Sequence, residues 1–370
     1  MKIVCYVNKV SGGGAERVMS VLANGLVRKG HLVDLVVDYE TDNEYPLDKR
    51  VNKHVMNGRF SQRAGNPILR NVGRVRFLRR LCKQRKAQVL ISFIQDANVR
   101  ALLATPFTGT RNIISVRNDP KSIHGHGIGL MLAKLIAKTL YPCAEGCVFQ
   151  TEEVRSWYTS KTRRKSRIIL NPVSEAFYRL PPVEQREKRI VTCGRLSEQK
   201  NHSLLIRSFA ALDKRFSDYT LHIYGEGPDR DKLEALCCEL GVKSRVVFEG
   251  RTNNIPEAIR AAALFVLSSD FEGLPNALME AMALGLPVIS TDCSGGGARV
   301  LLRDEKNGRI VPCQNENALT HAMQACLLSP DVAKEYGLQA RKDAEQFRVE
   351  RIIDSWEAYI RDVVQKKGKE

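Results

Sequence analysis

Short apolar runs that alternate with amphipathic helical stretches are the feature that most constrains how this chain folds. The chain opens with the β-prone run KIVCYV (2–7), a Gly-rich turn, the helical stretch AERVMSVLANGLVRKG and the run HLVDLVVD. Two buried strands joined by a helix form a βαβ unit, which produces a parallel sheet. The runs AQVLISF, NIISV and GCVFQT supply further strands. The sequence therefore predicts an α/β domain at the N-terminus.

A second series of the same kind begins near Arg189. Its apolar runs RIVTCGRL, YTLHIYGEG, RVVFEG, LFVLSS and PVIST alternate with helical stretches such as NHSLLIRSFAAL and DRDKLEALCCELG. Between the two series, Pro172, Pro181 and Pro182 interrupt regular structure. A chain of 370 residues is also too long for one ordinary hydrophobic core. We therefore expect two α/β domains, with the interdomain linker near these prolines.

The Gly-rich turn after the first run reads SGGGAER and includes Gly13. Glycines let backbone N–H groups approach a ligand closely, and the N-terminus of the helix behind them favours an anion. Gly12 and Gly14 fit the first two positions of a dinucleotide fingerprint, but Arg17 occupies the third. Asp38, after the second strand, would suit a ribose hydroxyl. A phosphate-binding turn and an ordinary strand-to-helix turn both remain open.

Two loops of the second series carry residues suited to a nucleotide. In GRLSEQKN, Arg195 and Lys200 lie between a strand and a helix, at the sheet edge where ligands bind in open α/β folds. Two cations there can neutralise a diphosphate, Arg with planar donors and Lys with a point charge. In YGEGP, Gly225 and Gly227 form a turn against which a ribose or base edge can pack. Taken alone, the GRLSEQKN loop is also compatible with two solvated surface cations, and the YGEGP loop with an ordinary turn between a strand and a helix.

Two glutamates, Glu272 and Glu280, occur in the stretch SSDFEGLPNALMEAM (268–282). Pro275 suits the first turn of a helix, because its missing N–H costs nothing there. Glu272 is therefore expected on the loop before that helix and Glu280 on the helix itself. This spacing does not stack the two carboxylates on one helix face, and nothing in the sequence requires the paired carboxyls of a glycosidase. Two interpretations remain open: the two carboxylates are simply solvated, or they make two separate contacts with a ligand.

These motifs, in this order, resemble the retaining glycosyltransferases of family four. GRLSEQKN, YGEGP and FEGLPNALMEAMALGLPVIST match the C-terminal half of the family, in which Glu272 and Glu280 form the E-x7-E motif, and SGGGAER and LNP match its N-terminal half. The resemblance covers essentially the whole chain. SGGGAER, VLISFIQDANV and SGGGARVLL look most like bacterial enzymes that extend lipid-linked oligosaccharides, such as N-acetylgalactosaminyltransferases.

The resemblance implies a fold and an activity. The fold is α/β of the GT-B type, with two Rossmann-like domains facing a cleft: residues 1–172 bind the acceptor and residues 173–351 bind the nucleotide sugar. The amphipathic C-terminal stretch, residues 352–370, crosses back to the first domain as a helix. The activity is transfer of a hexose or N-acetylhexosamine, with anomeric retention, from a UDP-sugar to a polyprenyl-diphosphate-linked glycan during assembly of bacterial surface polysaccharide or glycoprotein glycans. The resemblance implies neither a metal ion nor any other cofactor.

The resemblance also implies roles for particular residues. Arg195 and Lys200 would hold the diphosphate and stabilise it as the leaving group. Glu272 would contact the donor sugar, and Glu280 would accept hydrogen bonds from the ribose hydroxyls. A diphosphate oxygen would help to deprotonate the acceptor on the same face of the sugar. Further donor contacts would come from the chain at Gly13, Gly14, Gly225, Gly273, Leu274 and Pro275.

One loop departs from the family pattern. Many relatives carry a histidine after the strand where this chain reads ISVRNDP, and Arg117 stands there. Arg117 supplies a cation to the transition state in one interpretation. In another, Asn118 and Asp119 bind the acceptor, and in a third they only cap the loop before Pro120. We retain Arg117 as a candidate catalytic residue.

The net charge of +17 indicates a partner that carries phosphate, either nucleic acid, an anionic membrane face or a phosphorylated substrate. No Asp or Glu occurs from Arg59 to Leu90. Within this stretch, apolar residues from Leu69 to Leu81 recur at near-helical spacing among arginines, as in a helix that lies on an anionic membrane or grips a lipid diphosphate. An ordinary helix that packs on the core and exposes a basic face to solvent is an equally good interpretation of this stretch. GIGLMLAKLIAKTLY (127–141) is a second candidate for membrane contact.

Several other classes of protein are less compatible with the sequence. Aromatic residues make up 6% of the chain and are not clustered, so no nucleic-acid partner is expected. The ten cysteines lack zinc-ligand spacing and are expected to be reduced thiols. No signal peptide or spanning run is recognised, so we expect a cytoplasmic protein, peripheral on the inner face of the membrane. A nucleotide-sugar epimerase of the same fold remains the alternative function, and a nucleic-acid-binding protein is a third, less favoured one.

Overall fold

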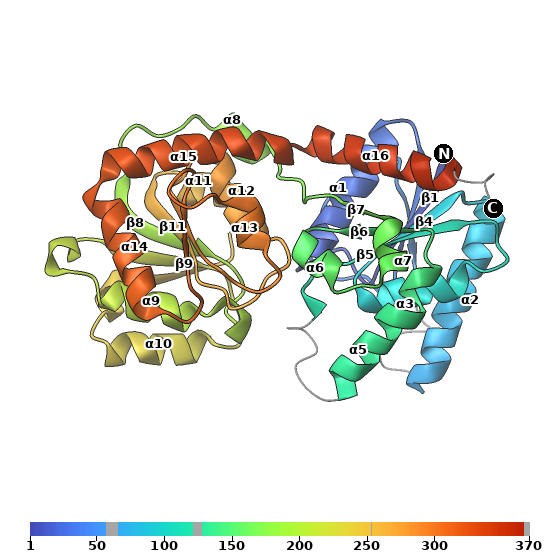
Figure 1. The fold of residues 1–370 in the computed structure, drawn as a ribbon, viewed down its shortest axis with the longest axis horizontal. Helices are drawn as coiled ribbons and strands as arrows, with labels where there is room; N and C mark the ends of the chain where they lie inside the picture. Colours follow the sequence, from blue (N-terminus) through green and yellow to red (C-terminus); the bar gives the residue numbers. More distant parts are fainter. Residues whose placement is uncertain (57–65, 121–127, 253, 366–370) are drawn as a thin grey trace. The chain divides into compact units, whose positions relative to one another are not determined.

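The computed structural model of the chain contains two compact units (Figure 1). Unit 1 comprises Met1–Pro172 together with Val349–Glu370, and unit 2 comprises Val173–Arg348. The chain therefore leaves unit 1 once and returns to it with its last helix. The structure describes residues 1–56, 66–120, 128–252 and 254–365.

Unit 1 is built on a sheet of seven strands. The strands are β1 (Lys2–Val7), β2 (Leu32–Val37), β3 (Asn52–Val55), β4 (Val89–Phe93), β5 (Arg111–Ser115), β6 (Gly146–Phe149) and β7 (Ser166–Ile168). Their order is β3-β2-β1-β4-β5-β6-β7, and every neighbouring pair is parallel. The order reverses at β1, because β2 and β3 lie on one side of it and the later strands on the other. The strands that the sequence predicted in this half are therefore confirmed as one parallel sheet.

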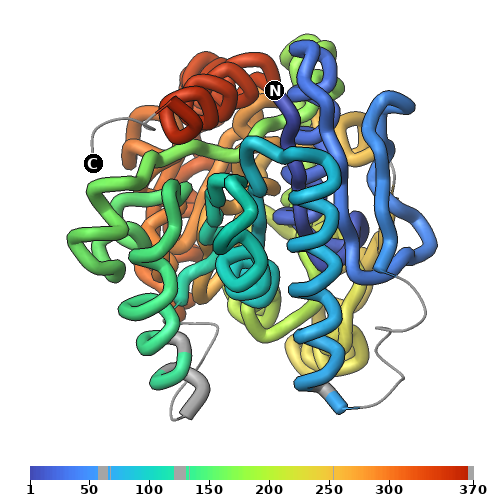
Figure 2. Tube along the Cα trace, turned by 90° about the vertical axis from the view of Figure 1, so that its right-hand side faces the viewer, coloured from blue at the N-terminus to red at the C-terminus, as the bar shows by residue number. Residues whose placement is uncertain are grey.

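Helices cover both faces of this sheet (Figures 1 and 2). The helices are α1 (Gly14–Arg28), α2 (Pro67–Arg85), α3 (Gln95–Ala104), α5 (Ile128–Thr139), α6 (Glu152–Ser156), α7 (Ser160–Arg164) and α16 (Val349–Gln365), with a 3-10 turn, η1 (Tyr141–Cys143). Side chains of a strand point alternately to opposite faces. Ile3 and Cys5 of β1 accordingly pack with α1 and α16, whereas Val4 and Tyr6 pack with α2 and α3. This alternation explains why β1 is buried without interruption from Ile3 to Val7.

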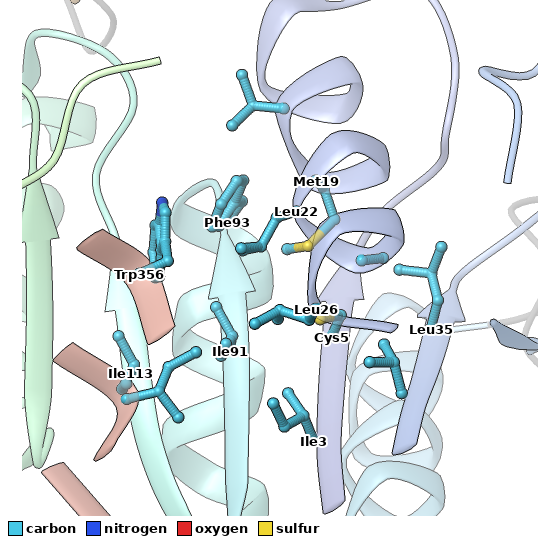
Figure 3. Close-up of a cluster of buried hydrophobic side chains, with 14 of the residues drawn as sticks. Ile3, Cys5, Met19, Leu22, Leu26, Leu35, Ile91, Phe93, Ile113 and Trp356 are labelled. Carbon is cyan, nitrogen blue, oxygen red and sulfur yellow. The ribbon is translucent and has the colours of Figure 1, made fainter. Parts of the chain in front are cut away.

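Helix α16 is part of the core of unit 1. Trp356 is fully buried, and its ring centroid lies 5.7 Å from that of Phe93 on β4 (Figure 3). A Cβ atom at Gly25 of α1 would lie 2.5 Å from Ile353, so the two helices approach each other at a glycine. Tyr359 Oη accepts a hydrogen bond from the Cys147 amide at 2.8 Å, which attaches the helix to β6. The amphipathic C-terminal stretch is therefore a packed helix of unit 1.

Unit 2 repeats the architecture with a sheet of six strands. The strands are β8 (Glu187–Cys193), β9 (Thr220–Tyr224), β10 (Val246–Gly250), β11 (Ala262–Leu267), β12 (Val288–Thr291) and β13 (Arg309–Val311). Their order is β10-β9-β8-β11-β12-β13, again with parallel neighbours. The first strand of the unit again lies where the order reverses. Both units are therefore Rossmann-like α/β folds, as expected.

The helices of unit 2 enclose a second hydrophobic core. They are α8 (Glu175–Arg179), α9 (His202–Ala210), α10 (Arg230–Glu239), α11 (Ile255–Ile259), α12 (Asn276–Ala283), α13 (Gly297–Leu301), α14 (Glu316–Leu328) and α15 (Pro330–Ala344), with 3-10 turns η2 (Glu198–Lys200), η3 (Lys214–Phe216), η4 (Lys243–Arg245) and η5 (Glu345–Phe347). Helices α8, α13, α14 and α15 and the strand β13 were not predicted from the sequence. Helix α8 is short, and the Ser174 side chain caps its N-terminus by accepting a hydrogen bond from the Ala176 amide.

Candidate active site

The carboxyl ends of β8 and β11 lie side by side in unit 2, where the strand order reverses. Ligands in open α/β sheets bind at such a switch point. The GRLSEQKN loop leaves β8 and the SSDFEGLP loop leaves β11, so two of the predicted donor loops meet here. Gly225 follows β9, the neighbour of β8 on its other side. Most of the predicted donor-binding residues therefore belong to one edge of one sheet.

Lys200 and Glu272 form an ion pair at this edge. Lys200 Nζ donates to Glu272 Oε1 at 2.5 Å, and Ser269 Oγ donates to the same oxygen at 2.9 Å. The Lys200 and Glu272 side chains are only 16% and 10% exposed. Removing two charges from water is costly, so each charge depends on the other for compensation. The structure thus brings two predicted site residues into direct contact.

Further hydrogen bonds connect the two loops that carry this pair. Ser268 Oγ donates to the Lys200 carbonyl at 2.9 Å, and Asn201 Nδ2 donates to Asp270 Oδ1 at 2.9 Å. Asn201 adopts a left-handed conformation with φ of 43° and caps helix α9 with its side chain. The position of Lys200 is therefore fixed by its own backbone as well as by its charge.

Glycines allow the loops of this edge to approach each other. Gly225 has a φ of 147°, and a Cβ atom there would lie 1.9 Å from the Gly194 carbonyl oxygen. A Cβ atom at Gly297, at the start of α13, would lie 2.2 Å from the Gly273 carbonyl oxygen. Any larger residue at Gly225 or Gly297 would have to displace a neighbouring backbone. Gly225 was predicted to contact the donor, and the structure shows a packing reason for the same glycine.

The placement of the two glutamates agrees with the sequence. Glu272 lies on the loop after β11, and Glu280 lies within α12. Helix α12 begins at Asn276, with Pro275 as its N-cap, one position earlier than the first-turn position expected. The Glu280 side chain is buried, and it adds to the rise that burial causes in the pKa of the Cys193 thiol at the end of β8. Glu280 therefore faces the same strand edge as Lys200.

The remaining predicted contacts differ in exposure. The Arg195 side chain is exposed, whereas Gly273 and Leu274 are buried. The Glu272 amide donates to the Ser294 carbonyl at 3.1 Å, which fixes the start of this buried segment. Of the two predicted cations at this edge, Arg195 is thus the more accessible to a ligand. The buried segment of Gly273 and Leu274 connects Glu272 to α12.

Three polar residues of this edge were missed by sequence reasoning. Ser269 holds Glu272, and Thr291 Oγ1 donates to the Ser269 carbonyl at 2.5 Å. Burial and, to a smaller extent, the nearby Lys200 together lower the pKa of the His202 imidazole to about 4. The ring is therefore neutral at pH 7. Thr291 could not be recognised from the local pattern because its partner follows another strand, whereas Ser269 and His202 lie only three and two residues from Glu272 and Lys200.

The Gly-rich turn of unit 1 carries Gly13 and Gly14. Gly12 has a φ of 77°, and Gly13 is the N-cap of α1. A Cβ atom at Gly13 would lie 2.1 Å from Glu16 Oε2, so the Glu16 carboxylate folds over this turn. Burial raises the pKa of that carboxyl, while its own backbone amide opposes the rise. The helix N-terminus, which favours an anion, therefore already has the Glu16 carboxylate beside it.

Arg117 follows β5 and is 6% exposed. Its Cζ atom lies 3.9 Å from the ring centroid of Phe93 and 5.7 Å from that of Trp356, and its Nη1 donates to Asn171 Oδ1 at 2.6 Å. Burial lowers the pKa of the Arg117 guanidinium to about 9. Contact with aromatic faces compensates part of the lost hydration of such a cation. Arg117 therefore anchors its loop inside unit 1, and a role in the transition state stays a prediction.

Asp38, the residue suited to a ribose hydroxyl, is engaged inside unit 1. Its exposed fraction is 2%. Tyr6 Oη donates to Oδ1 at 2.8 Å, and Arg100 Nη1 donates to Oδ2 at 3.1 Å. Arg74 Nη1 lies 3.2 Å from Oδ2. A ribose contact would have to break this network, so Asp38 serves the packing of α2 and α3 on the sheet.

Among the residues that the structure describes, no group of three or more His, Cys, Asp or Glu side chains could hold a metal ion. All ten cysteines are free thiols, as expected from their spacing. His124 and His126 of the HGH stretch lie outside the described residues. The described part of the chain contains no helix that is both long and apolar enough to cross a membrane.

Two parallel sheets of this strand order, one of them with cationic and acidic loops at its switch point, define a GT-B enzyme. The chain belongs to the group 1 glycosyltransferases. The family model "Glycosyl transferases group 1" matches residues 178–343, and the model "Glycosyltransferase Family 4" matches residues 12–177. The family and fold inferred from the sequence motifs are thereby confirmed.

Two relatives from Campylobacter jejuni are similar along nearly their whole length. One, an α-1,4-N-acetyl-D-galactosaminyltransferase named for a diNAcBac-PP-undecaprenol-linked glycan, is 26% identical and covers 98% of this chain and 99% of its own. The other is an N-acetylgalactosamine-N,N'-diacetylbacillosaminyl-diphospho-undecaprenol 4-α-N-acetylgalactosaminyltransferase. It is 28% identical, and the match covers 94% of this chain and 95% of the relative. The fold is similar to that of the Anabaena protein HepE in complex with UDP-glucose. The TM-score is 0.79 at 18% identity, with 98% of this chain and 100% of that one covered.

Proposed function

We propose that the protein transfers a hexose or N-acetylhexosamine from a UDP-sugar to a polyprenyl-diphosphate-linked glycan, with retention at the anomeric carbon. The observation that carries the proposal is the buried pair of Lys200 and Glu272 at the switch point of unit 2. Lys200 and the exposed Arg195 belong to the same loop and provide positive charge where a diphosphate would bind. This arrangement suits the departure of a nucleoside diphosphate.

In the proposed reaction the bond between the anomeric carbon and the diphosphate oxygen breaks, and a bond to the acceptor hydroxyl forms on the same face. Lys200 and Arg195 stabilise the negative charge that develops on the leaving diphosphate. The acceptor proton passes to a diphosphate oxygen. The two cations occupy the role that a divalent metal has in other transferases, so we propose a metal-independent enzyme. Glu272 contacts the sugar, and Glu280 accepts from the ribose hydroxyls.

The similar proteins support a particular class of donor and of acceptor. The HepE structure contains UDP-glucose, which supports a UDP-linked donor. The two Campylobacter relatives are named for glycans on diphospho-undecaprenol, which supports a lipid-linked acceptor. Such an acceptor is held in a bilayer, so we propose that the protein contacts the inner face of the cell membrane.

Helices α2 and α5 support this membrane contact. They extend on the same side of unit 1, with α3 between them (Figures 1 and 2). Leu78 and Leu81 of α2 are buried in the core, whereas Ile68 and Leu69 are about 70% exposed. Apolar side chains beside arginines suit an anionic lipid surface. Among the side chains of α2 and α5 that the structure describes, the exposed large apolar ones are Ile68, Leu69, Val72, Met131, Leu132 and Leu135.

Donor binding tests the proposal. Lys200→Ala should remove the stabilisation that UDP-sugars give the full chain, because the diphosphate loses a cation and Glu272 keeps a buried, uncompensated charge. We expect a loss of at least about tenfold in UDP affinity, roughly 1.4 kcal/mol, by calorimetry. Lys188→Ala is the matched control, because Lys188 forms an exposed ion pair with Asp218 in the same unit.

Equal UDP affinity in the Lys200→Ala variant, the Lys188→Ala variant and the wild type would contradict the site assignment. Transfer is then measured with a labelled donor and a lipid-linked acceptor. Conversion of a UDP-sugar in the absence of any acceptor would instead favour the epimerase.

A further inference from the structure

A buried imidazole lies at the start of the helix that follows the loop of Arg195 and Lys200. It belongs to His202, the first residue of α9, which is only 3% exposed. We propose that His202 is a positioning residue of the donor site, whose ring holds the backbone at Gly194 and Arg195 when the diphosphate of the donor binds. The inference rests on the proposed function and adds a residue that governs donor affinity without contacting the reacting atoms.

The ring of His202 is unusual because it is buried without a hydrogen bond. Neither Nδ1 nor Nε2 has a hydrogen-bond partner in the part of the chain that the structure describes. A buried polar group that has lost its hydration and gained no partner destabilises the fold. Most buried polar side chains are paired, so an unpaired one needs an explanation. The ring is neutral at pH 7 and therefore offers one N–H donor and one acceptor nitrogen.

A partner for the ring is close at hand in the backbone of Gly194 and Arg195. Burial and Lys200 lower the pKa of the imidazole, whereas the backbone at Arg195 and Gly194 opposes this fall. An acceptor near the ring N–H has this opposing effect, because it favours the protonated form. The ring thus lies beside the turn without being aligned to it for a hydrogen bond. A small movement of the turn would align the two groups.

The turn at Arg195 is already held on either side of that residue. The Gly194 amide donates to the Tyr224 carbonyl at 2.9 Å, and the Leu196 amide donates to the Glu226 carbonyl at 3.0 Å. Both carbonyls belong to the end of β9 and the loop after it. Arg195 lies between these two anchors, so a further hydrogen bond at its own backbone would fix the direction of its exposed side chain.

A bound diphosphate would act on this turn through the two cations. Arg195 and Lys200 are both attracted to the same anion. The Lys200 side chain also packs on the turn, because a Cβ atom at Gly194 would lie 3.0 Å from Lys200 Cε. Hydrogen bonds of a binding site are often poorly aligned before the ligand binds, and they tighten in the complex. The free energy lost in the unpaired ring is then regained as donor affinity.

This role has a signature that distinguishes it from packing. An apolar side chain of similar size at position 202 leaves no buried polar group unpaired, so it should not destabilise the protein in the absence of donor. The same side chain cannot form the hydrogen bond to the turn, so the donor should bind more weakly. Stability and donor affinity should therefore change independently of each other.

The test compares His202→Leu, His202→Asn and His202→Gln in the full chain, with UDP as the probe. His202→Leu should keep or raise the midpoint of thermal unfolding and weaken UDP binding at least about fivefold in calorimetry. The amides of Asn and Gln can replace Nδ1 and Nε2 as hydrogen-bonding groups, so one of them should restore affinity to within about twofold of wild type. His321→Leu is the matched control, because His321 is exposed on α14 of the same unit.

Nitrogen NMR gives a readout that packing alone would not change. The ring signals of His202, assigned by their loss in His202→Gln, should shift when the wild type is saturated with UDP, because a new hydrogen bond alters the shielding of the nitrogen. Wild-type UDP affinity in His202→Leu, a loss that neither amide restores, or ring signals that do not shift would overturn the inference and leave the proposed function standing. A wild type that binds neither UDP nor a UDP-sugar would overturn the proposed function and this inference with it.

Discussion

At the scale of single residues, the contacts of Glu272 bear on its role in the reaction. One carboxylate oxygen accepts hydrogen bonds from both Lys200 and Ser269. An oxygen that binds an ammonium and a hydroxyl is a poor nucleophile, because its electron pairs are already engaged. We therefore expect Glu272 to position Lys200 and to contact the donor sugar, rather than to attack the anomeric carbon.

Gly225 provides a sharp test at this scale. Gly225→Ala should displace the backbone at Gly194 and with it the loop of Lys200, because the new Cβ atom would lie 1.9 Å from the Gly194 carbonyl oxygen. We expect a stability loss of about 2–4 kcal/mol and a large loss of UDP affinity. Thermal unfolding and calorimetric titration with UDP measure the two effects.

Gly241 is the matched control for this substitution. It also has a positive φ, 67°, but a Cβ atom there would meet nothing within 4 Å. Gly241→Ala should therefore cost only backbone strain of about 1 kcal/mol and leave UDP affinity unchanged. Equal losses in the two variants would show that the close contact at Gly194 has no importance for the site.

At the scale of elements, the contact between α1 and α16 depends on a glycine within a helix. Gly25 lies within α1, in its last turn, and glycine inside a helix is normally unfavourable relative to alanine by about 0.5–1 kcal/mol. Its presence is explained by Ile353, whose Cγ1 would lie 2.5 Å from a Cβ atom at Gly25. The packing of α16 therefore outweighs local helix propensity at this position.

This conflict predicts whether a substitution at Gly25 stabilises or destabilises the protein. Gly25→Ala should destabilise the protein by about 1–3 kcal/mol, although the same change in an exposed helix stabilises it. Combining Gly25→Ala with Ile353→Ala should cost less than the sum of the single changes, since the truncated side chain leaves room for the new methyl group. Thermal unfolding of the four members of the cycle measures this coupling. Additive effects would contradict the proposed close contact.

The sequence predicted most elements but few of the contacts between them. The period of the apolar residues is local, so strands such as β1 and β11 and the division of Glu272 and Glu280 between loop and helix were predictable. The stacking of Arg117 on Trp356 joins segments that are far apart in the chain. Local patterns carry no information on such pairs, and the same holds for the hydrogen bond from Thr291 to the Ser269 carbonyl.

At the scale of the whole molecule, charge and exposed apolar surface occur together on unit 1. The net charge of +17 attracts anionic surfaces over distances up to about a Debye length, roughly 8 Å at physiological salt. The exposed apolar residues of α2 and α5 then provide contact at short range. The two contributions respond differently to salt, because screening weakens only the electrostatic one.

Vesicle binding tests the membrane contact. The full chain should bind vesicles of phosphatidylglycerol and phosphatidylcholine in co-sedimentation, and raising the salt from about 0.1 M to 1 M should weaken binding strongly, because the Debye length falls from about 10 Å to 3 Å. Replacing both Ile68 and Leu69 with Ser should reduce binding at least fivefold. Leu328→Ser is the control, since Leu328 is exposed on α14 of unit 2. Binding that is equal for neutral and anionic vesicles would contradict the expected role of charge.

The return of α16 to unit 1 has a consequence for the order in which the protein is made. During synthesis the N-terminal part of a chain generally folds first. Here the sheet of unit 1 emerges early, but the surface that receives Trp356, Ile353 and Tyr359 stays uncovered until the last helix leaves the ribosome. Unit 2 lies entirely between these two events. Unit 1 is therefore started before unit 2 and completed after it, and the nascent chain carries an open apolar face while unit 2 is being made.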